Sequence, residues 1–167
     1  MLKGQDIVVL LAVAGRPEWT IASVADGLGL SASAVHRSVE RATEAHLMAG
    51  RRRDVNVNAL EEFLVHASRH LFPARLQGPA RGVPTAWSTP PLATRLARLD
   101  EDPLVWPDPE GTSRGIALDP IHPSVPAAAR GDGALHERLA IVDALRAGGP
   151  RVRREAAEAL HEHLAAP

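Results

Sequence analysis

The chain has 167 residues, contains no cysteine and carries a formal charge of −1. The absence of cysteine excludes disulfides, thiolate metal sites and cysteine nucleophiles, and the near-zero charge excludes a global basic field that would draw the protein to nucleic acid. Any attraction to DNA must therefore arise from local basic patches. The chain length allows one domain, or one small domain with an appended module.

Residues 4–14 are predicted to form a first helix with a broad buried face, which Gly15 ends. The apolar run from Ile7 to Ala14 is shorter than the roughly 20 residues needed to span a bilayer. It also lacks the basic start and the cleavage pattern of a secretion signal. We therefore expect a cytoplasmic protein without membrane contact.

Residues 20–54 hold the pattern around which the chain is organised. Four apolar residues recur at helical spacing and give a second helix one buried face: Ile21, Val24, Ala25 and Leu28. Gly29 follows directly, and glycine tolerates the positive φ of a sharp helix exit. Ser31 stands where its hydroxyl can cap the next helix by accepting a hydrogen bond from a free amide.

The third predicted helix, residues 33–45, buries Val35, Val39 and Ala42. Its opposite face carries short or flexible side chains: Ser33, Ala34, His36, Arg37, Glu40 and Arg41. A face of hydrogen-bonding groups on a helix held out by a short turn fits the major groove of DNA.

A short basic hairpin is predicted after this helix. Its expected strands are residues 47–49 and 55–57, and its tip holds Gly50, Arg51, Arg52 and Arg53. Consecutive arginines at a hairpin tip suit contacts to DNA phosphates or to the minor groove. Trp19 is placed to begin another short strand that would pair with this hairpin.

The order of helices and hairpin over residues 5–70 resembles the winged helix-turn-helix regulators of bacteria, broadly of the MarR type. The resemblance implies a homodimer that binds double-stranded DNA. The candidate DNA contacts are Ser31, Ser33, His36, Arg37, Arg41, Arg51, Arg52 and Arg53. The predicted wing is shorter than in many such proteins. The same arrangement also occurs in enzymes and in protein-binding winged domains that never contact nucleic acid.

Residues 59–71 are predicted to form an amphipathic helix, with Asn58 and Glu61 placed as in a capping box and Pro73 as its stop. His66 and His70 stand one turn apart on it, which is the spacing of metal ligands. No third histidine lies near in sequence, so a structural or surface role is favoured and no metal site is predicted.

Residues 72–131 change in character, because most of the chain's 14 prolines fall there. Such a density excludes long helices and central strands, but the apolar residues, Trp87 and Trp106 among them, exclude a disordered linker. We expect an ordered, irregular module of short extended pieces, lying over the winged domain or a partner chain. The tryptophans are expected to serve packing, with a small-ligand pocket as the alternative.

Charge is polarised within this module. Its first half carries Arg75, Arg81, Arg95 and Arg98, and its second half carries Asp100, Glu101, Asp102, Asp108 and Glu110. The basic half either extends the DNA footprint or pairs with the acidic half, within one subunit or across a dimer.

The C-terminal part is again helical in pattern. Asp132 is expected to cap a helix over residues 134–147, which Gly148 and Gly149 end. Pro150 suits the start of a second helix, residues 151–165. Two helices joined by so short a turn are predicted to pack as an antiparallel hairpin, against the winged domain or a second subunit.

No phosphate loop, nucleophile elbow or metal cluster of known spacing occurs in the sequence, so we expect neither an enzyme nor a cofactor. The predicted fold is mainly α, in three parts: a winged helix-turn-helix domain (1–71), an irregular Pro-rich dimerisation or sensing module (72–131) and a C-terminal helical hairpin (132–167). The predicted function is a homodimeric repressor of transcription at a near-palindromic operator. The alternative is a protein-interaction module, such as an antitoxin-like or adaptor protein whose Pro-rich middle binds a partner enzyme.

Overall fold

The computed structural model describes residues 1–50 and 53–165. Within these residues the fold is mainly helical, with small sheets. The N-terminal elements are α1 (Gly4–Val13), α2 (Ile21–Leu28), α3 (Ala32–Glu44), β1 (Met48–Ala49), β2 (Asp54–Val55), α4 (Val57–His66) and α5 (Ser68–Leu71). They are followed by β3 (Leu76–Thr85), η1 (Ala86–Ser88), α6 (Leu92–Arg95), β4 (Leu104–Pro107), β5 (Ser113–Leu118), α7 (Val125–Gly131), α8 (Gly133–Ala147) and α9 (Pro150–Ala165).

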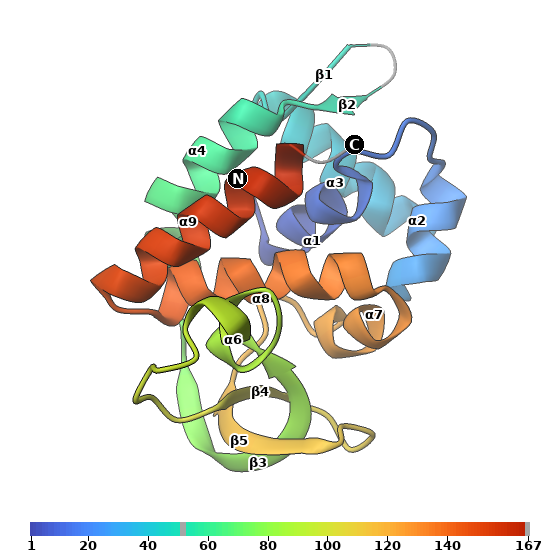
Figure 1. Cartoon of the computed structure of the whole chain (residues 1–167). Helices are drawn as coiled ribbons and strands as arrows, with labels where there is room; N and C mark the ends of the chain where they lie inside the picture. Colours follow the sequence, from blue (N-terminus) through green and yellow to red (C-terminus); the bar gives the residue numbers. More distant parts are fainter. Residues whose placement is uncertain (51–52, 166–167) are drawn as a thin grey trace.

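Helix α8 crosses the middle of the molecule and separates two layers (Figure 1). Helices α1 to α4 and α9 lie on one side of it, and strands β3 to β5 lie on the other. Because both sides are covered, α8 is buried around most of its circumference, Leu139, Ile141 and Val142 included. Ile7 of α1 and Trp106 of β4 belong to the same continuous apolar core, so α8 joins the two layers into one packed unit.

Strands β3, β4 and β5 form a small closed barrel. Strand β3 pairs antiparallel with β5 along its first part and with β4 along its second, while β4 and β5 pair in parallel. Gly82 stands where β3 changes partner, and a Cβ there would lie 1.8 Å from the carbonyl oxygen of Trp106. A side chain at this position would therefore prevent closure of the barrel.

The ten-residue strand β3 differs from the short extended pieces expected in the Pro-rich module. It contains Pro79 and Pro84, which sequence reasoning took as evidence against a long strand. Pro79 is paired only with β5 and Pro84 only with β4. At both prolines the strand is paired on one side only, and a residue without an amide hydrogen is tolerated at the unpaired edge.

The single helix expected over residues 59–71 is divided into α4 and α5. The Ser68 hydroxyl donates to the Leu64 carbonyl at 2.6 Å, a side-chain bond that competes with the helical ladder. The cap of α4 is Asn56, whose Oδ1 accepts from the Ala59 amide at 3.2 Å, and not Asn58 as predicted. The chain turns directly out of β2 into α4, which moves the helix start two residues toward the N-terminus.

Helices α8 and α9 follow the prediction for the C-terminus closely. Asp132 accepts from the Leu135 amide at 3.0 Å and caps α8, and α9 begins at Pro150 after two glycines. The two helices pack side by side (Figure 1).

A buried polar cluster joins α8 to the barrel. The Asp143 carboxylate of α8 accepts from Thr85 Oγ1 at 2.9 Å, from Trp106 Nε1 and from the Arg146 guanidinium. Arg146 also donates to the Phe72 carbonyl at 2.7 Å, just before β3. Complete burial raises the pKa of Asp143, and its three donors oppose this by favouring the charged form.

Candidate nucleic-acid interface

Helices α2 and α3 are joined by a tight turn whose polar groups are satisfied locally. Gly29 has φ +63°, in the left-handed region that favours glycine, and the Leu30 amide donates back to the Ala25 carbonyl at 2.9 Å. Ser31 then caps α3, because its Oγ accepts from the Ala34 amide at 3.1 Å. The glycine turn and the serine cap are therefore confirmed, and they fix where α3 begins.

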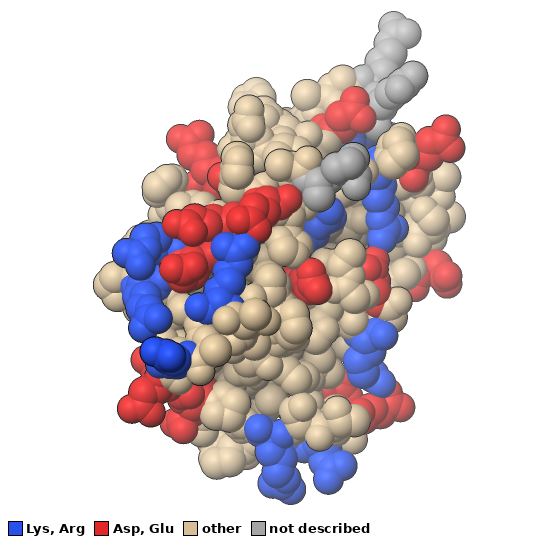
Figure 2. Space-filling view, viewed as in Figure 1, with Lys and Arg blue, Asp and Glu red and all other residues tan. Residues whose placement is uncertain are grey.

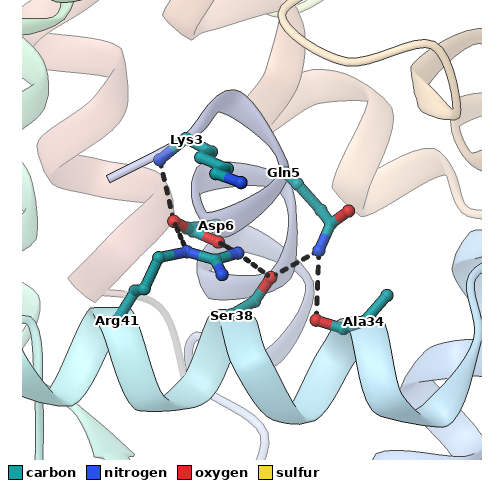
Figure 3. A network of polar contacts seen from close by, with 6 residues as sticks. All are labelled: Lys3, Gln5, Asp6, Ala34, Ser38 and Arg41. Atoms are coloured by element: carbon teal, nitrogen blue, oxygen red, sulfur yellow. Dashed lines mark hydrogen bonds and ion pairs between the residues drawn. The ribbon is translucent and has the colours of Figure 1, made fainter. Parts of the chain in front are cut away.

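A buried ion pair holds the inner side of α3 against α1 (Figure 3). Asp6 of α1 is fully buried, and its carboxylate accepts from Arg41 Nε at 2.8 Å and from Arg41 Nη2 at 2.6 Å. The Lys3 amide also donates to this carboxylate at 2.8 Å. The hydrogen bond to Asp6 raises the pKa of Arg41 further. Bidentate geometry of this kind resists rotation of one helix against the other.

A second set of contacts lies one turn earlier on α3. Gln5 Nε2 donates to the Ser38 hydroxyl at 2.7 Å and to the Ala34 carbonyl at 3.1 Å, and Arg41 reaches the same hydroxyl at 3.3 Å (Figure 3). Because these bonds link two turns of α3 to one end of α1, the helix is fixed in both position and rotation.

The outer face of α3 remains exposed and carries mixed charge. Ser33, His36, Arg37 and Glu40 are all exposed on it. His36 lies 3.6 Å from Glu40, one turn along the helix, and Ser33 shares a 3.1 Å hydroxyl contact with Ser31. Arg37 is the one predicted base-contacting arginine that α3 presents outward, since Arg41 is turned inward to Asp6.

The expected hairpin after α3 is present as β1 and β2, paired antiparallel through Met48 and Val55. The second strand was expected over residues 55–57, but it ends at Val55 because Asn56 caps α4 and Val57 begins it. Gly50 has φ +75° and Arg53 has φ +56°, so both ends of the tip lie in the left-handed region. Arg53 is exposed. Arg51 and Arg52, the other two predicted wing contacts, lie outside the described residues.

The strand expected at Trp19 is not formed in the described part of the chain. Thr20 instead caps α2, with its Oγ1 accepting from the Ser23 amide at 3.0 Å. The residues before α2 therefore form the start of that helix and do not pair with the described residues of the hairpin. The β1–β2 sheet has two strands.

Sequence reasoning missed Asp6, Gln5 and Ser38, which position α3. One signal was available: Asp6 is the sole charged residue within α1, whose remaining residues are mostly apolar. A carboxylate in such a helix is buried and needs a cationic partner. Arg41 was assigned to the outer face by its spacing alone, because a long side chain at the edge of a helix can turn to either side.

The other candidate groups fall into structural roles or open grooves. The Trp106 ring is buried in the core, and Trp87 Nε1 donates to the Asp102 carbonyl at 3.0 Å. A groove of about 420 Å³ between α4 and α9 is lined in part by His66 and His161. Among the residues that the structure describes, no three potential ligands are grouped to hold a metal ion.

Three charged residues of the Pro-rich module form ion pairs with helices α7 and α9, of which α9 lies outside the module. Arg95 forms an ion pair with Glu162 of α9. Asp108 pairs with Arg130 of α7 at 3.2 Å, and Glu110 pairs with the same arginine. These contacts differ from the expected pairing between the two halves of the module.

No protein-family model matches this chain, and no similar curated protein or solved structure was found. Over residues 1–50 and 53–165, no helix has both the length and the apolar character needed to cross a membrane.

Proposed function

We propose that the protein is a winged helix-turn-helix transcriptional regulator that acts in the cytoplasm as a homodimer, most simply as a repressor. Each subunit places α3 in a major groove of DNA, with the β1–β2 hairpin against the neighbouring backbone. Two α3 helices related by a two-fold axis then contact half-sites about one turn, roughly 34–36 Å, apart.

The observation that carries the proposal is the contrast between the two sides of α3. Its inner side is fixed by the bidentate Asp6–Arg41 ion pair and by the hydrogen bonds of Gln5. Its outer side carries hydrogen-bonding groups that are exposed to solvent. Recognition of base edges requires side chains on a rigid element that is accessible from one side.

The proposed contacts follow from this geometry. Ser33, His36 and Arg37 are assigned to bases, and the hairpin arginines are assigned to phosphates, with Arg53 as the described member. Arg41 is removed from the set because Asp6 holds its guanidinium. Glu40 repels phosphates on the outer face, so the hairpin must supply much of the attraction.

The hairpin assignment has its own test. Arg53→Ala should weaken binding to every duplex about equally and lower the slope of log affinity against log salt by about one unit. Arg114→Ala on the barrel removes the same charge away from α3 and serves as the control. An unchanged slope for Arg53→Ala would remove the hairpin from the interface.

The site itself can be found by selection of bound duplexes from a random pool. We expect enrichment of an inverted repeat, because two copies of α3 related by a two-fold axis contact the same sequence in opposite directions. If no sequence is enriched, the α3 face does not serve base recognition and the proposal fails.

The competing hypothesis is a protein-interaction module whose Pro-rich middle binds a partner enzyme. Leu104, Trp106 and Leu118 of the barrel belong to the same core as α8, which favours a middle part that folds with the rest of the chain. Limited proteolysis of the isolated protein separates the two hypotheses. Rapid cleavage within residues 72–131 would favour a segment that folds on a partner.

A further inference from the structure

The outer face of α9 carries an ordered row of charges. Arg151, Arg154, Glu158 and Glu162 are all exposed, and their spacings of three, four and four residues place them on one stripe of the helix. Figure 2 shows basic side chains gathered at the start of α9 and acidic side chains along its middle. The surface of this helix is thus basic in its first part and acidic in its second.

This order is opposite to the one that the helix dipole favours. Acidic groups are stabilising near a helix N-terminus and basic groups near its C-terminus, yet the first turn of α9 contains no acidic residue. Arg153 has a structural reason for its place, because it donates to the Gly148 carbonyl at 2.9 Å at the end of α8. Arg151 and Arg154 have no comparable contact to α8 in the described part of the chain.

Partners within the chain compensate this stripe incompletely. Arg154 lies 3.9 Å from its neighbour Glu155, and Glu162 pairs with Arg95 but keeps 59% of its side chain exposed. Within the described residues, Arg151 and Glu158 form neither an ion pair nor a side-chain hydrogen bond. The stripe therefore keeps Arg151 without an ion-pair partner in its basic part and Glu158 without one in its acidic part, among the described residues.

The row of charges is complementary to itself when reversed. An antiparallel copy of α9, with its midpoint between residues 156 and 157, sets Arg151 opposite Glu162 and brings Arg154 within one residue of the position opposite Glu158, twice over. The outer charges are 11 residues apart, about 16 Å at 1.5 Å per residue, so all four pairs lie along one line. Antiparallel packing also aligns the two helix dipoles favourably.

We infer that this face of α9 binds a second copy of the same chain through antiparallel α9–α9 packing. A two-fold interface requires that one patch complement itself, and the row of α9 meets that requirement. The inference rests on the proposed function only in supplying the two-fold axis of its homodimer. Because the contacts are exposed ion pairs, the dimer is expected to be weakened by salt.

Charge reversal tests this interface without DNA. Sedimentation equilibrium of the full chain at low salt should show a dimer. Arg151→Glu/Arg154→Glu makes the stripe wholly acidic and Glu158→Arg/Glu162→Arg makes it wholly basic. Each variant alone should have a dimer dissociation constant raised about 100-fold or more, because like charges then face each other. An equimolar mixture of the two variants should restore a dimer that contains one copy of each.

The matched control is Arg81→Glu/Arg114→Glu, which reverses two exposed arginines on the barrel and should leave the dimer intact. Thermal unfolding of each variant verifies that it is folded. A wild-type monomer at low salt, reversed variants that still dimerise, or a mixture that fails to associate would overturn the inference. A dimer that does not bind duplex DNA would instead contradict the proposed function alone.

Discussion

Two buried ion pairs fix two parts of the molecule, and they differ in their access to water. The Asp143 and Arg146 side chains between α8 and the barrel are 2% and 3% exposed, whereas the Arg41 side chain, paired with Asp6 between α1 and α3, is 18% exposed. The first pair lies inside the core and makes the barrel part of it. The second lies at the edge of the core, where it fixes one side of α3 and leaves the other side exposed.

Breaking the Asp143–Arg146 pair should have the larger effect on stability. Asp143→Ala leaves Arg146 buried without a carboxylate and removes the acceptor of Thr85 and Trp106. We expect a loss of about 3–5 kcal/mol in the free energy of unfolding, measured by urea denaturation. Asp143→Ala/Arg146→Met should cost less than the two single changes summed, since no unpaired charge remains. A loss under about 1 kcal/mol for Asp143→Ala would contradict this role.

Breaking the Asp6–Arg41 pair should have an intermediate effect on stability and should also weaken DNA binding. In Asp6→Ala, Arg41 can turn partly toward water because it is not fully buried. We therefore expect a loss of about 1–3 kcal/mol on unfolding, together with weaker duplex binding because α3 is no longer held in position. A double-mutant cycle with Arg41→Met should give a coupling of at least about 0.5 kcal/mol. Additive losses would show that the pair does not join the helices.

These two regions also differ in how far the sequence predicts them. Local signals were sufficient at the α3 end, where a glycine exit and a serine cap stand beside each other in the chain, and at Asp132, which caps α8. The barrel depends on contacts between residues far apart in sequence. Gly82 is paired with both Ser113 and Pro107, which no local pattern indicates.

Long-range partners also explain the missed parts of the candidate site. Asp6 and Arg41 are 35 residues apart, so spacing alone placed Arg41 on the outer face and left Asp6 without a role. By contrast, Ser33, His36 and Arg37 are exposed as expected, because their place on α3 follows from the helical period.

Two arginines on α3 provide the sharpest test of the proposed DNA-binding face. Arg37 is exposed, so Arg37→Ala should change the free energy of unfolding by no more than about 0.5 kcal/mol. It should cost about 1–3 kcal/mol in binding at one base position of the selected site. Arg41→Ala is the control. It should lower the free energy of unfolding and leave the base preference unchanged, because Arg41 is paired with Asp6. Equal losses on every sequence from Arg37→Ala would contradict its assignment to a base.

The smallest effect concerns His122, just before α7. The Ser124 amide donates to its Nδ1 at 3.2 Å, and burial lowers the pKa of His122 below its ordinary value of 6.5. The unfolded chain therefore takes up this proton at a higher pH than the folded chain, so stability falls as the pH drops below about 6.5. His122→Asn should reduce this loss in urea denaturations between about pH 7.5 and 5. An identical pH dependence in both proteins would exclude the imidazole as its source.

The central claim is that the α3 end of the molecule recognises base sequence. Its most direct test is a salt titration of the wild-type protein against the selected duplex and a scrambled duplex of the same length. We predict that both affinities fall as salt rises, and that the selected duplex is bound at least about 1,000-fold more tightly at physiological salt. Equal affinities for the two duplexes at every salt concentration would contradict the claim.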